Sequence, residues 1–105
     1  MVKVNWTRQA IEDRYEIREY YQPRSAKYAE QLTDKIFEKE TLLENHPQIG
    51  RMVPELERPE IRELIYKNYR IVYHVVSDER IDILTVHNGL RPLTEESIFG
   101  WENAA

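Results

Sequence analysis

Five residues in the second half of the chain have the side chains that cleavage of a phosphodiester bond would need: Glu63, Arg70, His74, His87 and Arg91. Attack of an RNA 2′-hydroxyl on its neighbouring phosphate requires a base, an acid for the leaving oxygen and cations for the crowded phosphate. Arg70 and Arg91 would clamp the phosphate, and His87 or Glu63 would move the protons. The sequence therefore contains the residue types of a ribonuclease.

The same residues also have a structural interpretation, which stays open at this point. Arg70 on a strand would be an ion-pair partner of Glu63 or of another carboxylate across a sheet. His74 shares a strand face with Val72 and Val76, which is typical of a half-exposed strand residue.

The histidines give no indication of a metal site. His46, His74 and His87 lack the close i, i+4 spacing of paired ligands, so no metal and no cofactor are expected. His46 precedes Pro47 and would cap a helix end through the terminal carbonyls. His87, at the end of a strand, is the better candidate for a functional surface, although a structural role is open there too.

Charge argues against direct nucleic-acid binding. The formal net charge is -4, and the tail, residues 92–105, has three glutamates and no lysine or arginine. Proteins that bind nucleic acid usually carry a basic excess because phosphate contacts dominate their affinity. Arg51, beside Gly50 in a loop with prolines on both sides, is either a functional cation or a solvated loop residue.

Length and composition predict one domain, residues 1–105, ending in the acidic tail 92–105. There is no cysteine, no apolar run long enough to span a membrane, and no apolar signal stretch at the N-terminus. We therefore expect a soluble cytoplasmic protein that does not bind membranes.

Hydrophobic periodicity predicts the elements that must position these residues. Strands are expected at residues 2–6, 61–66, 69–76 and 81–87, and helices at 8–21 and from Ser25 to a stop at 45–47, with an irregular loop up to residue 60. In the last strand, alternation places Ile81, Ile83 and Thr85 opposite Asp82, Leu84 and Val86. This order predicts an α+β fold, with an N-terminal strand and an antiparallel two-helix hairpin packed on one face of an antiparallel sheet.

Aromatic residues are the remaining signal. Tyr20, Tyr21 and Tyr28 cluster around the turn between the two helices, either as packing residues or as anchors for a partner. Phe99 and Trp101 indicate that the acidic tail docks onto another surface, without saying which one. They could stack on a base but cannot transfer a proton.

The order and spacing of several short motifs resemble the RelE/ParE toxin superfamily over nearly the full chain, and its ParE-like branch more than RelE. These motifs are Trp6-Thr7 with Ala10 and Asp13, Tyr20, His46-Pro47, Gly50-Arg51, Pro54-Glu55, Arg62-Glu63-Leu64, Tyr69-Arg70-Ile71-Val72-Tyr73, and Ile83-Leu84-Thr85-Val86-His87 followed by Gly89 and Arg91.

The resemblance implies a bacterial growth inhibitor, of the plasmid stabilisation type, that a cognate antitoxin neutralises. The ParE branch poisons DNA gyrase without being an enzyme, whereas the RelE branch cuts messenger RNA on the ribosome. Arg70 and Arg91 lie at or near the positions of phosphate-binding arginines in the RelE branch, but the ParE branch keeps Arg70 too. No lysine follows Lys67 and no tyrosine follows Tyr73, so residues typical of the RelE branch are missing.

Three hypotheses follow. The first is a ParE-like toxin that binds a protein target, DNA gyrase, and its antitoxin. The second is a ribosome-dependent endoribonuclease, and the third is a degenerate toxin that only binds antitoxin, suggested by the acidic tail and a thinned cation cluster at residues 87–91. The residues expected to bind target or antitoxin are Arg51, Arg62, Tyr69, Arg70, His87, Arg91, Phe99 and Trp101.

Overall fold

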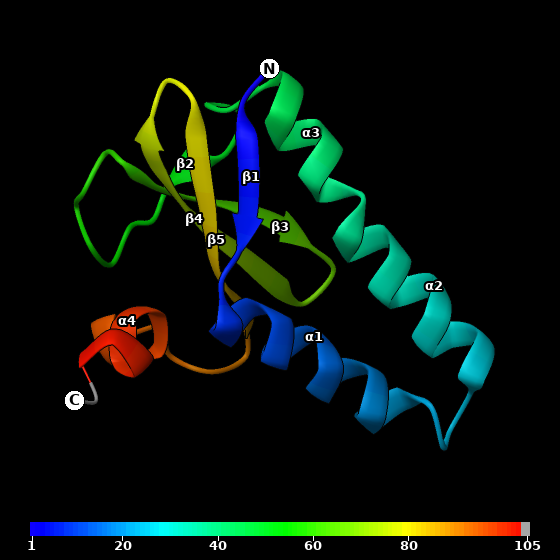
Figure 1. The fold of residues 1–105 in the computed structure, drawn as a ribbon. Coiled ribbons are helices and arrows are strands. Elements are labelled where there is room, and N and C mark those ends of the chain that lie inside the picture. Colours follow the sequence, from blue (N-terminus) through cyan, green and yellow to red (C-terminus); the bar gives the residue numbers. More distant parts are fainter. Residues whose placement is uncertain (104–105) are drawn as a thin grey trace.

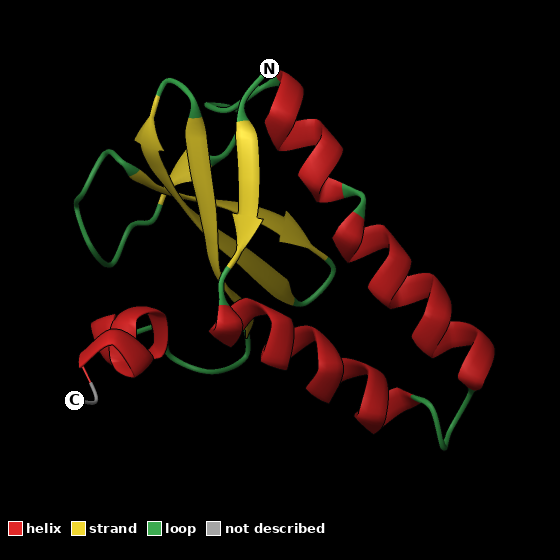
Figure 2. Ribbon diagram, in the orientation of Figure 1, coloured by secondary structure: helices red, strands yellow, loops and turns green. Residues whose placement is uncertain are grey.

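Five strands form one sheet in the computed structural model, which describes the backbone of residues 1–103 and the side chains of residues 1–99. The strand order is β1-β5-β4-β3-β2. The elements along the chain are β1 (Lys3–Trp6), α1 (Arg8–Tyr21), α2 (Ala26–Phe37), α3 (Lys39–Asn45), β2 (Arg51–Met52), β3 (Ile61–Tyr66), β4 (Tyr69–Ser77), β5 (Arg80–Asn88) and α4 (Glu95–Asn103) (Figures 1 and 2). The predicted α+β class is confirmed.

The first two helices begin where the sequence predicts. The side chain of Thr7 accepts a hydrogen bond from the Ala10 amide, and that of Ser25 accepts one from the Tyr28 amide. Each cap satisfies an amide that would otherwise lack a partner at a helix start. Both helices are thus capped as expected. Only residues 22–25 connect them, and α1 and α2 form the expected hairpin.

The second predicted helix is broken in two. α2 ends at Phe37 and α3 begins at Lys39, with Glu38 between them and no side-chain cap. At the break, the ring of Phe37 stacks on Trp6 with centroids 5.7 Å apart, and the Arg14 guanidinium lies 4.6 Å from the Phe37 centroid. Leu43 in α3 remains fully buried, so the apolar stripe continues across the break.

The sheet is mixed, whereas the sequence analysis predicted an antiparallel one. β1 lies parallel to β5, with Lys3 opposite Arg80 and Trp6 opposite Ile83, and the other pairs are antiparallel. The helices return the chain to the start of β1, where the Val2 amide donates to the Glu44 carbonyl. The antiparallel strands that follow leave β5 running in the direction of β1, and hydrophobic alternation carries no information on that direction.

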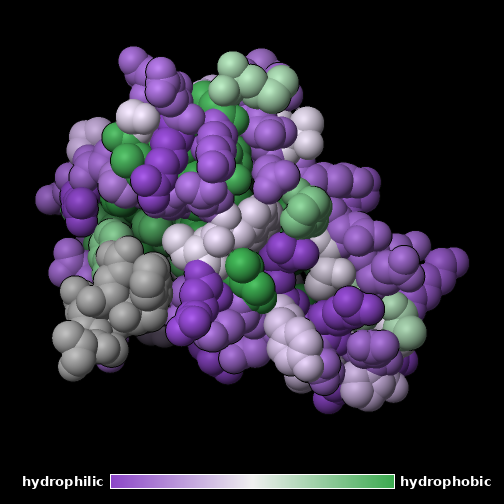
Figure 3. Space-filling view, viewed as in Figure 1, coloured by the Kyte–Doolittle hydropathy of each residue, from purple (hydrophilic) through white to green (hydrophobic). Residues whose placement is uncertain are grey.

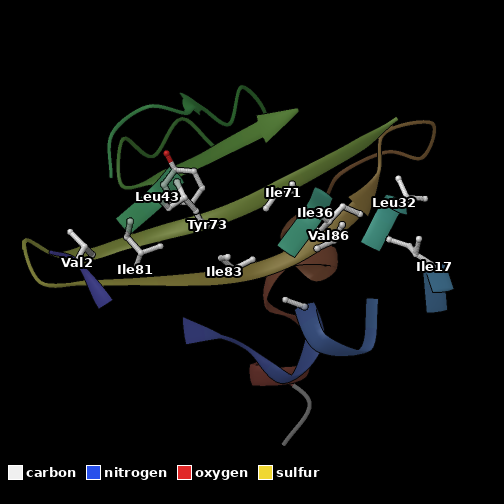
Figure 4. Close-up of a cluster of buried hydrophobic side chains, with 11 residues drawn as sticks. Val2, Ile17, Leu32, Ile36, Leu43, Ile71, Tyr73, Ile81, Ile83 and Val86 are labelled. Atoms are coloured by element: carbon white, nitrogen blue, oxygen red, sulfur yellow. The ribbon is translucent and has the colours of Figure 1, made fainter. Parts of the chain in front are cut away.

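Both faces of the sheet are covered, and the main core lies under the helices. It joins Ala10 and Ile17 of α1 and the apolar stripe of α2 and α3 to strands β4 and β5; Figure 4 shows ten of its residues: Val2, Ile17, Leu32, Ile36, Leu43, Ile71, Tyr73, Ile81, Ile83 and Val86. A smaller cluster on the opposite face contains Val53, Ile61, Val72, Leu84, Leu93 and Ile98.

A β-bulge changes the predicted alternation of β5. Tyr73 is opposite Ile83, but Val72 is opposite Thr85, so Leu84 is an extra residue in β5. Val86 consequently packs in the main core with Ile83, although the alternation placed it on the other face. The prediction was wrong here because a bulge depends on the pairing with β4.

The acidic tail forms α4, which the sequence analysis did not predict as a helix. Ile98 is fully buried in the smaller cluster and Phe99 packs against it, so the expected docking of Phe99 is confirmed. The Arg58 guanidinium lies 5.4 Å from the Phe99 ring centroid. The side chain of Trp101 lies outside the described residues. No helix in the described part of the chain is long and apolar enough to cross a membrane.

Gly50 lies where a side chain would collide with the core. A Cβ atom at this position would lie 2.5 Å from the Glu63 carbonyl oxygen and 2.6 Å from the Tyr73 hydroxyl. Gly50→Ala should therefore lower the free energy of unfolding by about 1–3 kcal/mol. Urea unfolding measures this change. Leu90→Ala, at an exposed position, is the control, and an equal change in both variants would contradict the prediction.

Candidate functional site

Four charged side chains form an ion-pair network on the sheet face opposite α1 and α2. Glu63 of β3, whose side chain is 0% exposed, accepts hydrogen bonds from Arg51 Nε and Arg70 Nε, each at 2.6 Å. The other two guanidinium nitrogens of Arg70 bond to Glu55, at 2.6 and 2.8 Å. All three nitrogens of the Arg70 guanidinium are thus bonded to carboxylates, as its structural interpretation predicted.

The register of the sheet produces this network. Arg51 is directly opposite Glu63 across β2 and β3. Arg70 of β4 is opposite Ile65, two residues beyond Glu63, which leaves it within reach of Glu63 along the diagonal. Glu55 reaches Arg70 from the loop between β2 and β3. That loop contains Glu57 with a φ of 52°, an uncommon conformation for a residue other than glycine.

Hydrogen bonding within the network favours the charged forms of Glu55 and Arg70. Hydrogen bonding to Arg70 is the largest cause that lowers the pKa of Glu55 from 4.5 to about 2. The same hydrogen bonds to Glu55, followed by those to Glu63, raise the pKa of Arg70. Glu55 and Arg70 therefore remain ionised throughout the physiological pH range.

The Glu55 carboxylate should make stability depend on pH. Its pKa is lower in the folded chain, so its contribution is present above pH 4.5 and is lost as the pH falls towards about 2. Because the side chain is 38% exposed, solvent screening reduces the effect to about 1 kcal/mol. Urea unfolding at several pH values should show the wild type losing its advantage over Glu55→Gln in this window. A difference that stays constant across the window would contradict the assignment.

Arg62 lies apart from this network, on the other side of β3. Its Nη1 donates to the Gly50 carbonyl at 2.8 Å, and its Nε is buried without a hydrogen-bond partner among the described residues. The Gly50 amide in turn donates to the Tyr73 hydroxyl at 2.9 Å. Arg62, which is half-buried, therefore holds the loop before β2.

A groove of about 660 Å³ lies between α1 and the last residues of β5. Three of the predicted binding residues, Tyr69, His87 and Arg91, line it. Tyr20, which is 56% exposed, and Leu90, which is 79% exposed, also line it. Figure 3 shows that the surrounding surface over α1 is largely hydrophilic. The groove thus brings together three of the eight predicted binding residues.

The groove exists because β1 is shorter than β5. β1 covers the edge of β5 only as far as Ile83. Beyond that point α1 satisfies the edge: the Thr7 hydroxyl donates to the carbonyls of Ile83 and Leu84, and the Asp13 carboxylate accepts from the Val86 amide at 2.9 Å. Asp13 also accepts from the Thr85 hydroxyl. Asp13 therefore replaces a neighbouring strand at the bulge.

The tyrosines at the end of the groove pack against one another. The Tyr21 ring lies edge-on to Tyr20 and to Tyr28, with centroids 4.8 and 5.1 Å apart. Burial, followed by a hydrogen bond to Tyr21, raises the pKa of Tyr69. Tyr21, Tyr28 and Tyr69 thus pack within this cluster, whereas the Tyr20 side chain remains 56% exposed.

Among the candidate catalytic residues, Glu63, Arg70 and His87 lie at neighbouring positions of β3, β4 and β5, whereas His74 lies apart from them. Arg70 is opposite His87 across β4 and β5, and the ring Nε2 of His87 is 3.0 Å from the Arg91 carbonyl oxygen. His74 is four residues along β4 from Arg70, roughly 13 Å at the rise of a strand. The described residues contain no group of acidic or histidine side chains that could hold a metal ion.

Sequence reasoning missed two residues that organise the site. Asp13 and Glu55 were noted within family-like motifs, but neither was predicted as a site residue. Glu55 follows Pro54 in an irregular loop, and only the folded path of that loop brings it to Arg70. Asp13 could have been found from its spacing, because it lies three residues after Ala10 and four before Ile17, on the buried face of α1.

A helical hairpin over one face of a five-stranded mixed sheet defines a small α+β fold. A solved structure described as the chromosomal ParDE TA system from P. aeruginosa shares this fold, with 24% sequence identity, a TM-score of 0.69, and coverage of 84% of this chain and 96% of that chain. A family model described as ParE toxin of type II toxin-antitoxin system, parDE, matches residues 4–92. The chain belongs to this ParE toxin family, as the resemblance indicated. No curated protein matches the chain significantly.

Proposed function

We propose that the chain is a non-enzymatic toxin that acts in the bacterial cytoplasm, inhibits growth by binding DNA gyrase and is neutralised by a cognate antitoxin. Membership of the ParE toxin family supports the pairing with an antitoxin. Such a pair would serve to stabilise a plasmid that carries it.

The observation that supports the proposal most directly is the ion pair between Arg70 and Glu63. A ribonuclease of this fold would need Arg70 to bind a phosphate and Glu63 to accept a proton, but each is bonded to the other at 2.6 Å. Arg70 is also bonded to Glu55 at two nitrogens. Binding a phosphate would require breaking these charge-assisted hydrogen bonds, which are among the stronger hydrogen bonds in proteins.

The groove between α1 and β5 is the proposed docking place for the antitoxin. The edge of β5 beyond Ile83 has no neighbouring strand, and the exposed side chains of Tyr20 and Leu90 lie beside it. Because Thr7 and Asp13 already bond the β5 backbone as far as Val86, an extended or helical segment would dock there mainly through apolar contacts and would pair with the backbone only beyond Val86. Arg91 adds a cation that would favour an acidic segment.

The experiment that tests the target is a supercoiling assay with purified toxin and DNA gyrase. Micromolar toxin should inhibit supercoiling, and an excess of the cognate antitoxin should restore it. Induction of the wild-type chain in cells should leave transcript ends unchanged, whereas the ribonuclease hypothesis requires cleavage that Arg70→Ala and Arg91→Ala abolish. No inhibition of gyrase, together with cleavage of transcripts on ribosomes, would replace the proposal with the ribonuclease hypothesis. If the chain caused no growth arrest at all, the remaining hypothesis would be the degenerate toxin that only binds antitoxin.

The antitoxin groove is tested by affinity. Leu90→Asp places a charge on the groove and should weaken antitoxin binding roughly tenfold or more, since anchors of this kind contribute above 1 kcal/mol. Ile11→Asp is the matched control because Ile11 is 51% exposed and does not line the groove. Equal affinities for both variants would place the antitoxin elsewhere without affecting the gyrase assay.

A further inference from the structure

Asn88 and Gly89 form a reactive dipeptide at the end of β5. Asparagine followed by glycine can cyclise, because the glycine has no side chain to hinder the approach of its amide nitrogen to the asparagine side chain. The other four asparagines of the chain are followed by Trp, His, Tyr and Ala. Asn88 is therefore the residue at which spontaneous deamidation is chemically easiest.

The fold itself requires glycine at position 89. A Cβ atom there would lie 2.8 Å from the carbonyl oxygen of Asn68, in the turn between β3 and β4. The Gly89 amide donates a hydrogen bond to that same carbonyl. The reactive sequence is thus a consequence of the close approach between the end of β5 and the β3–β4 turn.

Hydrogen bonds to other residues engage both reacting groups, the Gly89 amide and the Asn88 side chain. The Gly89 nitrogen, which would be the nucleophile, is bonded to Asn68. The Oδ1 atom of Asn88 accepts from the Leu90 amide at 3.0 Å, and its backbone carbonyl accepts from the Arg91 amide at 3.0 Å. Cyclisation requires that Gly89 leave Asn68 and that the Asn88 side chain leave Leu90.

We propose that Asn88 is a deamidation site that the folded turn suppresses and that local opening of the end of β5 exposes. In the reaction the Gly89 nitrogen loses its proton and forms a bond to Cγ of Asn88, and the side-chain nitrogen leaves as ammonia. Water then opens the cyclic imide at either carbonyl and gives aspartate or isoaspartate. Water is the only co-reactant, and no oxidant or reductant takes part.

The product would change the groove described above. Asn88 lines the groove with His87 and Arg91, so either product adds a carboxylate to a surface that now carries a neutral amide. Isoaspartate also lengthens the backbone by one carbon and would shift Gly89 from its bond to Asn68. The modification would thus alter the charge and the shape of one surface, and this inference does not depend on the proposed function.

The test compares the folded full-length chain with the chain in concentrated urea, both incubated at mildly alkaline pH. Peptide mass spectrometry measures aspartate and isoaspartate at position 88. In urea Asn88 should react faster than the other four asparagines, and folding should slow it roughly tenfold or more, because hydrogen bonds each worth about 1 kcal/mol must open. Asn88→Gln is the control that assigns the mass change to this residue.

Hydrogen exchange provides the second measurement. The factor by which folding slows deamidation should match the protection of the Gly89 amide, since both reactions wait for the same opening. Equal rates in the folded chain and in urea would overturn the proposal. So would deamidation at another asparagine ahead of Asn88 in urea, or protection of Gly89 without any slowing of the reaction.

Discussion

Glu63→Gln is expected to lower the free energy of unfolding by about 3–5 kcal/mol, the range for removing one member of a buried ion pair. The substitution preserves the size of the side chain but leaves the Arg70 guanidinium, whose side chain is only 13% exposed, without its buried counter-charge. Arg51 loses the same partner, but its side chain is 61% exposed and water compensates it. Urea unfolding at neutral pH measures the change.

A matched control is Glu60→Gln. Glu60 also pairs with an arginine, Arg58, at 2.8 Å, but both side chains are well exposed, at 39% and 44%. Exposed ion pairs contribute little to stability, so this variant should unfold close to the wild type. Similar unfolding free energies for the two glutamine variants would show that the network around Glu63 is not the buried anchor described here.

Asp13→Ala is expected to lower the free energy of unfolding by about 2–4 kcal/mol, because hydrogen bonds to a charged group contribute about 1.5–3 kcal/mol each. The substitution removes the acceptor of the Val86 amide and of the Thr85 hydroxyl. It thereby leaves the bulged edge of β5 without a partner at the point where α1 meets the sheet.

Glu12→Ala is the control for this second variant, because Glu12 is an exposed residue of the same helix. Hydrogen exchange gives a local readout: the Val86 amide should lose protection in Asp13→Ala and keep it in Glu12→Ala. Unchanged protection of Val86 in Asp13→Ala would contradict the role assigned to the carboxylate, whatever the change in global stability.

The local elements could be predicted from the sequence because each depends on neighbouring residues. Thr7 and Ser25 mark helix starts by their own side chains, and the alternation from Tyr69 onwards marks a strand. The direction of β1, the bulge at Leu84 and the break at Glu38 could not be predicted in this way. Each of them is decided by a segment far away in the sequence.

The same distinction between local and distant contacts decides which parts of the site could be predicted. A pair between Arg70 and Glu63 was predictable, because both residues lie on neighbouring strands of a hairpin. The participation of Glu55 was not, since an irregular loop carries no periodic signal for its path. The groove was unpredictable for another reason: it exists only because β1 ends at Trp6 while β5 continues to Asn88.

The parallel contact between β1 and β5 also has a consequence for synthesis on the ribosome. Asn5 and Asp82, which are opposite each other, are separated by 77 positions. At about 5–20 residues per second, β1 would wait roughly 4–15 seconds for its neighbour to be translated. Contacts between such distant segments also slow folding. The nascent chain thus acquires its complete sheet only after β5 has been translated, and a binding partner that is already present could meet the chain before that point.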